Sequence, residues 1–315
     1  MSTSYVPNHV DSARETWSES AKLVADALAA VILLLVAFAG GATPSWLLSQ
    51  ARARGQLGRS LAFSLGNMLS AGVMVSAGFV HLLGDAVEDL GDTGFPTAPL
   101  LCGSGLLLTI IADSVASSFA ESSSQSDTRA GDHGLSCGAK YSQVSGGAAC
   151  KVSGDGPGSP SADDGKPPPV SFITVALLGC ALSFHSVLEG AALGAQESAS
   201  RTADVFVAIA AHKGLAAYAL GSSLVESKTT AVRMWSVLTP FAVATPIGIA
   251  VGVILSEFSS GRVSAACSAL ASGTFLYVAL MEVIPNELRH KDNLAVKIAT
   301  LVLGFSLMSL LAKWA

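Results

Sequence analysis

The sequence is poor in charge. Only 13% of its 315 residues are Asp, Glu, Lys or Arg, whereas a soluble globular domain carries about 25%. Hydrophobic residues make up 50% of the chain, and the net charge of −5 provides no basic surface for nucleic acid. These values exclude a nucleic-acid-binding protein and an ordinary soluble domain, and they indicate a chain that lies within a lipid bilayer.

Several chemical signatures are also missing. The five cysteines form no CxxC pair, so they do not indicate a disulfide framework. The sequence contains neither the GxxxxGK[ST] motif of the usual ATP-binding loop nor the HExxH motif common in zinc proteases. We therefore expect neither an ATP-driven pump nor a metalloprotease of that kind.

Long apolar runs are what the chain does have. Eight segments reach the roughly 20 residues needed to cross the hydrocarbon of a bilayer, and each should be a helix because an open strand cannot satisfy its backbone in lipid. They cover 24–42, 60–83, 99–119, 170–195, 203–225, 234–256, 263–285 and 294–314. The predicted fold class is an all-α, polytopic membrane protein with eight transmembrane helices.

One long connection separates three of these helices from the other five. Residues 120–169 are rich in Ser, Gly and Pro and are predicted to be a disordered loop. The chain then divides into an N-terminal tail (1–23), helices one to three (24–119), the loop, and helices four to eight (170–315).

Basic residues predict the orientation of the chain. With the N-terminus outside, twelve of the 18 Lys and Arg residues fall in cytoplasmic connections and five fall outside, as the positive-inside rule requires. Both termini are then expected outside and the long loop in the cytoplasm. We expect a multi-pass protein of the plasma membrane, with an intracellular organelle membrane as the alternative.

Two of the apolar segments carry ionisable residues, which are costly there. A charged side chain costs about 2.5–3.5 kcal/mol at the centre of a transmembrane helix, so it persists where it pairs, binds an ion or faces water. His185 and Glu189 are four residues apart and share one helix face, and His212 lies in the next segment. Two imidazoles and a carboxylate suit a divalent metal such as zinc, and the pattern predicts that the chain moves this metal across a membrane.

Small residues crowd the same two segments. Gly190 and Gly194 form a GxxxG motif, and Gly214 and Gly221 give the next segment a face without bulky side chains. Such faces let helices approach closely in lipid. They predict that the two segments pack on each other and bring His185 within reach of the ion that His212 would bind.

Other interpretations stay open at this point. The trio could be a hydrogen-bonded structural unit, or Glu189 could pair with Lys213, which needs a partner in the membrane. A fourth metal ligand is expected to be water or Ser186, because a transported ion is not held in a closed cage. The functional alternatives are an intramembrane zinc hydrolase and a metal sensor that does not transport.

Five stretches in chain order resemble the ZIP (ZRT/IRT-like) family of metal transporters. They begin at Ala71, His185, His212, Thr245 and Gly273. The resemblance implies a carrier, not an enzyme, that brings zinc into the cytosol between the fourth and fifth helices. It also implies an elevator-like movement and a homodimer, with the lipid bilayer as surroundings. Zinc is the substrate rather than a cofactor, and such ligands would also admit Fe²⁺, Mn²⁺ or Cd²⁺.

One departure from the family pattern changes the expected number of ions. Many members hold two metal ions and have Asn and two carboxylates where this chain has Ser186, Lys213 and Ala216. An ammonium cannot ligate while charged and repels a second cation. The chain resembles the subgroup with a His-Lys fifth helix and should bind one ion, with Lys213 in place of the second charge.

Three more residues are candidates for the route of the ion. His81 precedes an acidic connection and is either a ligand on the way in or a boundary histidine bonded to backbone. Asp113 is a lone carboxylate in the third helix, either on the pathway or a structural partner. Glu282 resembles a family position near the inner end of the seventh helix, where an exit relay is weighed against simple solvation.

Overall fold

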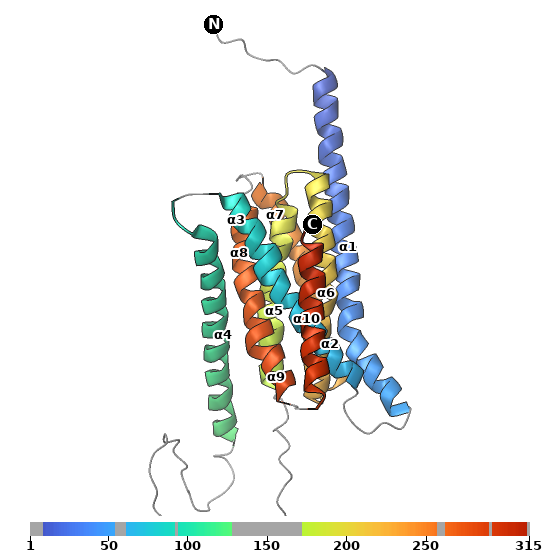
Figure 1. The fold of residues 1–315 in the computed structure, drawn as a ribbon. Coiled ribbons are helices and arrows are strands. Elements are labelled where there is room, and N and C mark those ends of the chain that lie inside the picture. Colours follow the sequence, from blue (N-terminus) through green and yellow to red (C-terminus); the bar gives the residue numbers. More distant parts are fainter. Residues whose placement is uncertain are drawn as a thin grey trace, which may run out of the picture.

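The computed structural model describes residues 9–53, 61–91, 94–127, 172–256, 262–289 and 292–313, and all regular structure in them is helical (Figure 1). In chain order, the elements are α1 (His9–Ala53), α2 (Leu61–Ser76), the π-helical η1 (Ala77–Leu82), α3 (Leu83–Leu90), α4 (Thr97–Asp127), α5 (Phe172–Gly194), α6 (Ala199–Glu226), α7 (Ala231–Ser256), α8 (Arg262–Tyr277), the π-helical η3 (Val278–Val283), α9 (Ile284–Leu288) and α10 (Leu294–Leu311). Eight helical segments are long and apolar enough to cross a membrane. The predicted all-α, polytopic fold is confirmed.

Two helices run further than the apolar stretches that predicted them. α1 begins at His9, within the predicted tail, and α4 continues to Asp127. Hydropathy locates only the part of a helix that crosses lipid, and residues 120–127 contain no Gly or Pro to end α4. The loop predicted over 120–169 is therefore helical in its first eight residues, and the rest of it lies outside the described residues.

Two of the membrane-crossing segments change from α to π geometry part of the way along. α2, η1 and α3 form one span over Leu61–Leu90, and α8, η3 and α9 form another over Arg262–Leu288. π-helical turns inside α-helices often occur at functional sites. His81 lies in η1 and Glu282 lies in η3, so two of the predicted pathway residues sit where the helical geometry changes.

Glycines set the distances between neighbouring helices. A Cβ added at any of ten glycines would lie within 2.4 Å of a backbone oxygen on another helix, so each marks a place where two backbones touch. The pairs are α1–α6 (Gly40, Gly221), α5–α7 (Gly190, Gly194, Gly248, Gly252), α2–α10 (Gly72, Gly304) and α4–α8 (Gly105, Gly273).

The prediction that the GxxxG motif of α5 packs against α6 was wrong. Gly190 and Gly194 face the backbone of α7, and Gly221 faces Gly41 of α1. A stripe of small residues shows that some helix approaches closely but does not specify which one. The small faces of α5 and α6 are therefore turned to α7 and α1, and the faces that carry ionisable residues are left to meet each other.

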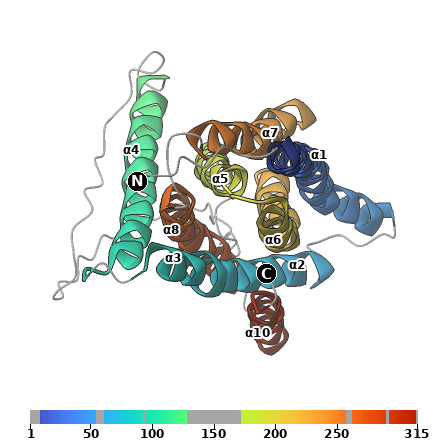
Figure 2. The ribbon, with the colours of Figure 1, turned by 90° about the horizontal axis from the view of Figure 1, so that it is seen from above.

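The touching pairs join into two groups of helices. The α5 group consists of α1, α5, α6 and α7. The α1–α6 and α5–α7 pairs are joined because the Leu238 side chain of α7 packs against Gly41 of α1. The α8 group consists of α2, η1, α3, α4, α8, η3, α9 and α10, joined by a 3.0 Å hydrogen bond from the Ser272 hydroxyl to the Gly78 carbonyl. None of the ten glycine contacts joins one group to the other in the described part of the chain. Figure 2 shows α5 inside the bundle and α4 and α10 at its rim.

The glycine contacts make a prediction about stability. Gly105→Ala should destabilise the protein by about 1–3 kcal/mol, as overpacking does, because its Cβ would meet the Leu270 carbonyl oxygen at 2.2 Å. The measurement is thermal unfolding in detergent. Gly103→Ala, on the same helix, is the matched control because nothing lies within 4 Å of its added Cβ. Equal unfolding temperatures for the two variants would contradict this account.

Candidate metal site

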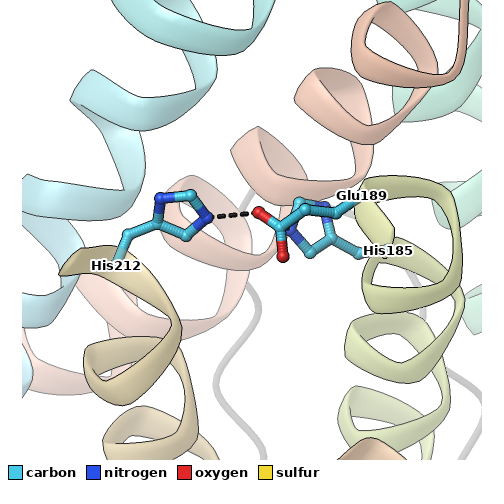
Figure 3. A group of neighbouring side chains, drawn as sticks. All are labelled: His185, Glu189 and His212. Carbon is cyan, nitrogen blue, oxygen red and sulfur yellow. Dashed lines mark hydrogen bonds and ion pairs between the residues drawn. The ribbon is translucent and has the colours of Figure 1, made fainter. Parts of the chain in front are cut away.

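Three ionisable side chains from two helices meet in the interior. His185 and Glu189 project from one face of α5, and His212 reaches towards them from α6 (Figure 3). Their exposed fractions are only 2%, 1% and 1%. One ligand atom from each residue lies within 4.8 Å of the other two. The structure thus brings together the three residues that the sequence singled out as metal ligands.

Glu189 lies between the two imidazoles. One of its oxygens, Oε1, is hydrogen-bonded to His212 Nε2 and lies 3.6 Å from His185 Nε2. Within the described part of the chain, His185 Nε2 and the other carboxylate oxygen, Oε2, are buried without a hydrogen-bond partner. A buried polar atom left unpaired costs about 1–3 kcal/mol. A divalent cation among these atoms would satisfy both of them and neutralise the carboxylate.

The other ring nitrogen of His185 fixes its tautomer. Nδ1 lies 3.0 Å from the carbonyl oxygen of Ala271 and 3.1 Å from the hydroxyl of Thr274. A carbonyl oxygen can only accept, so we assign the proton to Nδ1. In the neutral ring, Nε2 then carries a free lone pair that points towards Glu189, which is the form that binds a metal.

An aromatic ring from α8 closes one side of the site. Phe275 stacks on His185 with ring centroids 4.2 Å apart and an interplanar angle of 5°, and it contacts His212 at 5.2 Å and 57°. Phe275 is itself fully buried. The ring limits the movement of both imidazoles and keeps water off this side.

The turn between α5 and α6 is fixed to α1, which sets the register of the two ligand-bearing helices. The Lys22 ammonium donates to Asp26 (2.8 Å) and to the carbonyl of Gly194 at the end of α5 (3.0 Å). The Thr202 hydroxyl, in the first turn of α6, donates to the other oxygen of Asp26 (3.2 Å). The buried Asp26 therefore links α1 with both helices.

Lys213 does not pair with Glu189 within the described structure. Its ammonium donates to the hydroxyl of Ser186 (2.6 Å) and lies 4.2 Å from the ring centroid of Phe241. An ammonium over an aromatic face gains electrostatic stabilisation where water is excluded. Ser186, considered as a fourth ligand, is thus the hydrogen-bond partner of Lys213.

A cavity of about 260 Å³ leads from the α3 end of the bundle to Glu189. His81 lies in its wall and makes a 2.7 Å ion-pair contact with Asp85. The other charged residues in the wall are Glu88, Asp89, Arg201 and Asp204. We did not expect Arg201 at this position from the sequence, although its spacing of eleven residues before His212 is about three helical turns and places both on one face.

Asp113 and Glu282, the two other pathway candidates, meet around a tyrosine. The Tyr277 hydroxyl lies 3.4 Å from the Glu282 carboxylate and interacts with Asp113 of α4. Tyr277 follows Phe275 by two residues on α8. The cluster therefore lies on the α9 side of the trio, whereas His81 lies on the α3 side. The structure groups Asp113 with Glu282 and separates both from His81.

A family comparison agrees with this arrangement. Residues 23–312 match the family model described as ZIP Zinc transporter. Zinc transporter ZIP1 of Homo sapiens is 29% identical over 297 residues, which cover 89% of this chain and 88% of that protein. Two shorter matches have higher identity. Zinc transporter ZIP2 of Homo sapiens is 37% identical over 140 residues, and protein zntD of Dictyostelium discoideum is 41% identical over 144 residues.

The extent of these matches differs. The shared segments span 45% of human ZIP2 and 21% of zntD, and they cover 42% and 44% of this chain. The match to human ZIP1 and the family model both extend over nearly all of the chain. With its eight membrane-crossing helices, this chain belongs to the ZIP zinc transporter family.

Proposed function

We propose that this protein carries a divalent metal, zinc foremost, across the membrane through a site formed by His185, Glu189 and His212. The observation that supports it most is a pair of buried ligand atoms, His185 Nε2 and Glu189 Oε2, which have no hydrogen-bond partner in the described part of the chain and belong to a set of nitrogen and oxygen donors. Members of the family are transporters, so the protein is a carrier and not an enzyme.

Each residue has a defined part in binding. His185 offers a free lone pair at Nε2, and Glu189 supplies the negative charge that compensates the cation. His212 gives up its hydrogen bond with Glu189 when the ion enters between them. Three protein ligands leave one position for water, as in zinc sites that exchange a ligand. Because Lys213 places a positive charge beside Ser186, the site holds one ion. Fe²⁺, Mn²⁺ and Cd²⁺ are further candidate substrates.

The two ends of the bundle differ in access. At the α3 end, the acidic cavity reaches Glu189. At the α9 end, polar side chains on successive turns of α6 bond to the α8 group. Tyr218 donates to the Phe63 carbonyl (3.1 Å) and Ser222 donates to Asn67 (2.6 Å). We therefore infer that the proposed site is open at the α3 end, where the cavity reaches it, and closed at the α9 end, where these hydrogen bonds join the two groups in the described part of the chain.

A buried carboxylate supports the closed end. Glu287 accepts hydrogen bonds from Ser64 (2.6 Å) and from Asn67 (2.7 Å), and it lies 3.7 Å from the Lys297 ammonium. Glu287 and Lys297 are 1% and 2% exposed. Both belong to the α8 group, so this network gives α6 a rigid surface on which to close.

The grouping of helices supports an elevator-like movement. All three proposed ligands lie on α5 and α6, within the α5 group, and the backbone contacts at glycine join helices only within a group. Side-chain hydrogen bonds cross between the groups instead, and these are weaker and exchangeable. We propose that the α5 group shifts against the α8 group, closing the cavity and opening the α9 end past Asp113 and Glu282.

We further propose that the α3 end faces the outside and the α9 end faces the cytosol. The distribution of Lys and Arg supports this orientation, with both termini outside. The acidic cavity would then attract cations from the outside, and transport would be uptake, across the plasma membrane or from an organelle lumen.

Removal of a ligand should abolish transport. His185→Ala, Glu189→Gln and His212→Ala should each reduce zinc influx by more than about tenfold, because losing even an outer partner of a ligand costs about 10- to 100-fold in affinity. The measurement is uptake of radiolabelled zinc at matched surface expression. Phe184→Leu is the control, since that neighbouring side chain is 44% exposed and does not belong to the proposed ligand set. If saturable uptake persists after each of the three substitutions, the protein is still a transporter but these residues do not form its metal site.

A bridge between the two groups should block transport. Ala192→Cys with Ser264→Cys would join α5 to α8 where the Ser264 hydroxyl now donates to the Ala192 carbonyl (2.9 Å). Influx should stop when a short thiol cross-linker bridges the pair and recover after reduction. Ser272→Cys is the control, because it faces the native Cys102 (3.3 Å) within the α8 group. Full transport with the first pair bridged would contradict a shift of one group against the other.

A further inference from the structure

The three proposed ligands raise a question about release. His185, Glu189 and His212 all lie in the α5 group, so a rigid shift of that group carries them together and leaves their mutual distances unchanged. Among the protein's own side chains, those of the α8 group are then the ones whose contacts with the ligands change between the two positions. A conformational change biases binding only where the contacts differ between the two states.

The polar contact from the α8 group to a ligand ring is made at His185. The Nδ1–H of His185 is shared between the carbonyl oxygen of Ala271 (3.0 Å) and the hydroxyl of Thr274 (3.1 Å). Thr274 in turn donates to the same carbonyl (2.7 Å), which orients its hydroxyl lone pairs towards the ring. Thr274 is fully buried, so water does not take over this bond in the present conformation.

We propose that Thr274, together with the Ala271 carbonyl, is a positioning residue for His185 that acts in one conformation only. While the cavity is open, the pair holds the proton on Nδ1 and turns Nε2 towards Glu189. When the α5 group shifts along α8, the bond breaks and His185 becomes a weaker, less ordered ligand. This inference rests on the proposed transport function and adds a cause for release.

The magnitudes are consistent with such a role. A shift of α5 by one helical turn, about 5.4 Å, moves the ring nitrogen beyond the roughly 3.2 Å limit of an N–H···O bond. Loss of an outer hydrogen bond to a metal-binding histidine lowers metal affinity by about 10- to 100-fold. Phe275 would lose its stacking on His185 in the same step, because it lies on the same helix.

Thr274→Val tests the proposal, since valine keeps the branched shape and removes the hydroxyl. Two quantities are measured: the KM and maximal rate of zinc influx, and the zinc affinity of the purified full-length protein in detergent. We expect KM and the dissociation constant to rise about 3- to 10-fold, less than the full effect of an outer partner because the Ala271 carbonyl remains. The maximal rate should stay the same or increase, and Thr274→Ser should restore the wild-type values.

Thr245→Val on α7 is the matched control. Thr245 is also fully buried, and its hydroxyl has no hydrogen-bond partner within the described structure, so the same substitution there should leave KM unchanged. Equal effects of Thr245→Val and Thr274→Val, or failure of Thr274→Ser to restore affinity, would overturn the proposal. If His185→Ala abolishes influx while Thr274→Val behaves as wild type, only the positioning role fails. If His185→Ala transports normally, the metal site itself fails.

Discussion

The arrangement of the bundle depends on one carboxylate held between two imidazoles in an apolar interior. Glu189 is 1% exposed, and its Oε1 contacts His212 and lies near His185, whereas its Oε2 has no hydrogen-bond partner among the described residues. An ionised carboxylate at this depth is costly unless an opposite charge accompanies it. In the proposed function, a divalent cation would supply that charge and complete the set of donors. The cavity that reaches Glu189 from the α3 end would give such an ion room to exchange its water for these donors.

Lys213 shows how the same interior accommodates an ammonium group beside the proposed metal site. Its ammonium is satisfied locally by the Ser186 hydroxyl and the ring of Phe241, and it does not compete for Glu189. The carboxylate therefore keeps its charge available for an incoming ion. A second divalent ion next to the Lys213 ammonium would meet a repulsion that is strong in a medium of low dielectric constant, which supports the proposal of a single ion.

Helix contacts within a group differ in kind from those between the two groups. Backbone contacts at glycine cannot slide without a clash, so they hold helices together within each group. Hydrogen bonds made by side chains cross the boundary, from Tyr218 and Ser222 at the α9 end to His185 at the proposed site. In the shift proposed above, such bonds could be exchanged one for another. Access to the proposed site and the support of its ligands would then change together.

The sequence by itself determined the number of spans, their helical nature and the identity of the three ligand candidates. Length and hydropathy suffice for the first two, because lipid offers no other partner to the backbone. The ligand candidates can be identified from ionisable residues inside apolar segments, because such a residue needs a partner or a function to be tolerated there. The tertiary structure decided which helices touch, since the small faces of α5 and α6 turned to α7 and α1 rather than to each other. It also decided that Lys213 pairs with Ser186, and that Thr274 and Phe275 of α8 support His185. These contacts join residues 27 to 90 positions apart in the chain, and no local pattern encodes which distant side chain a buried polar group will meet.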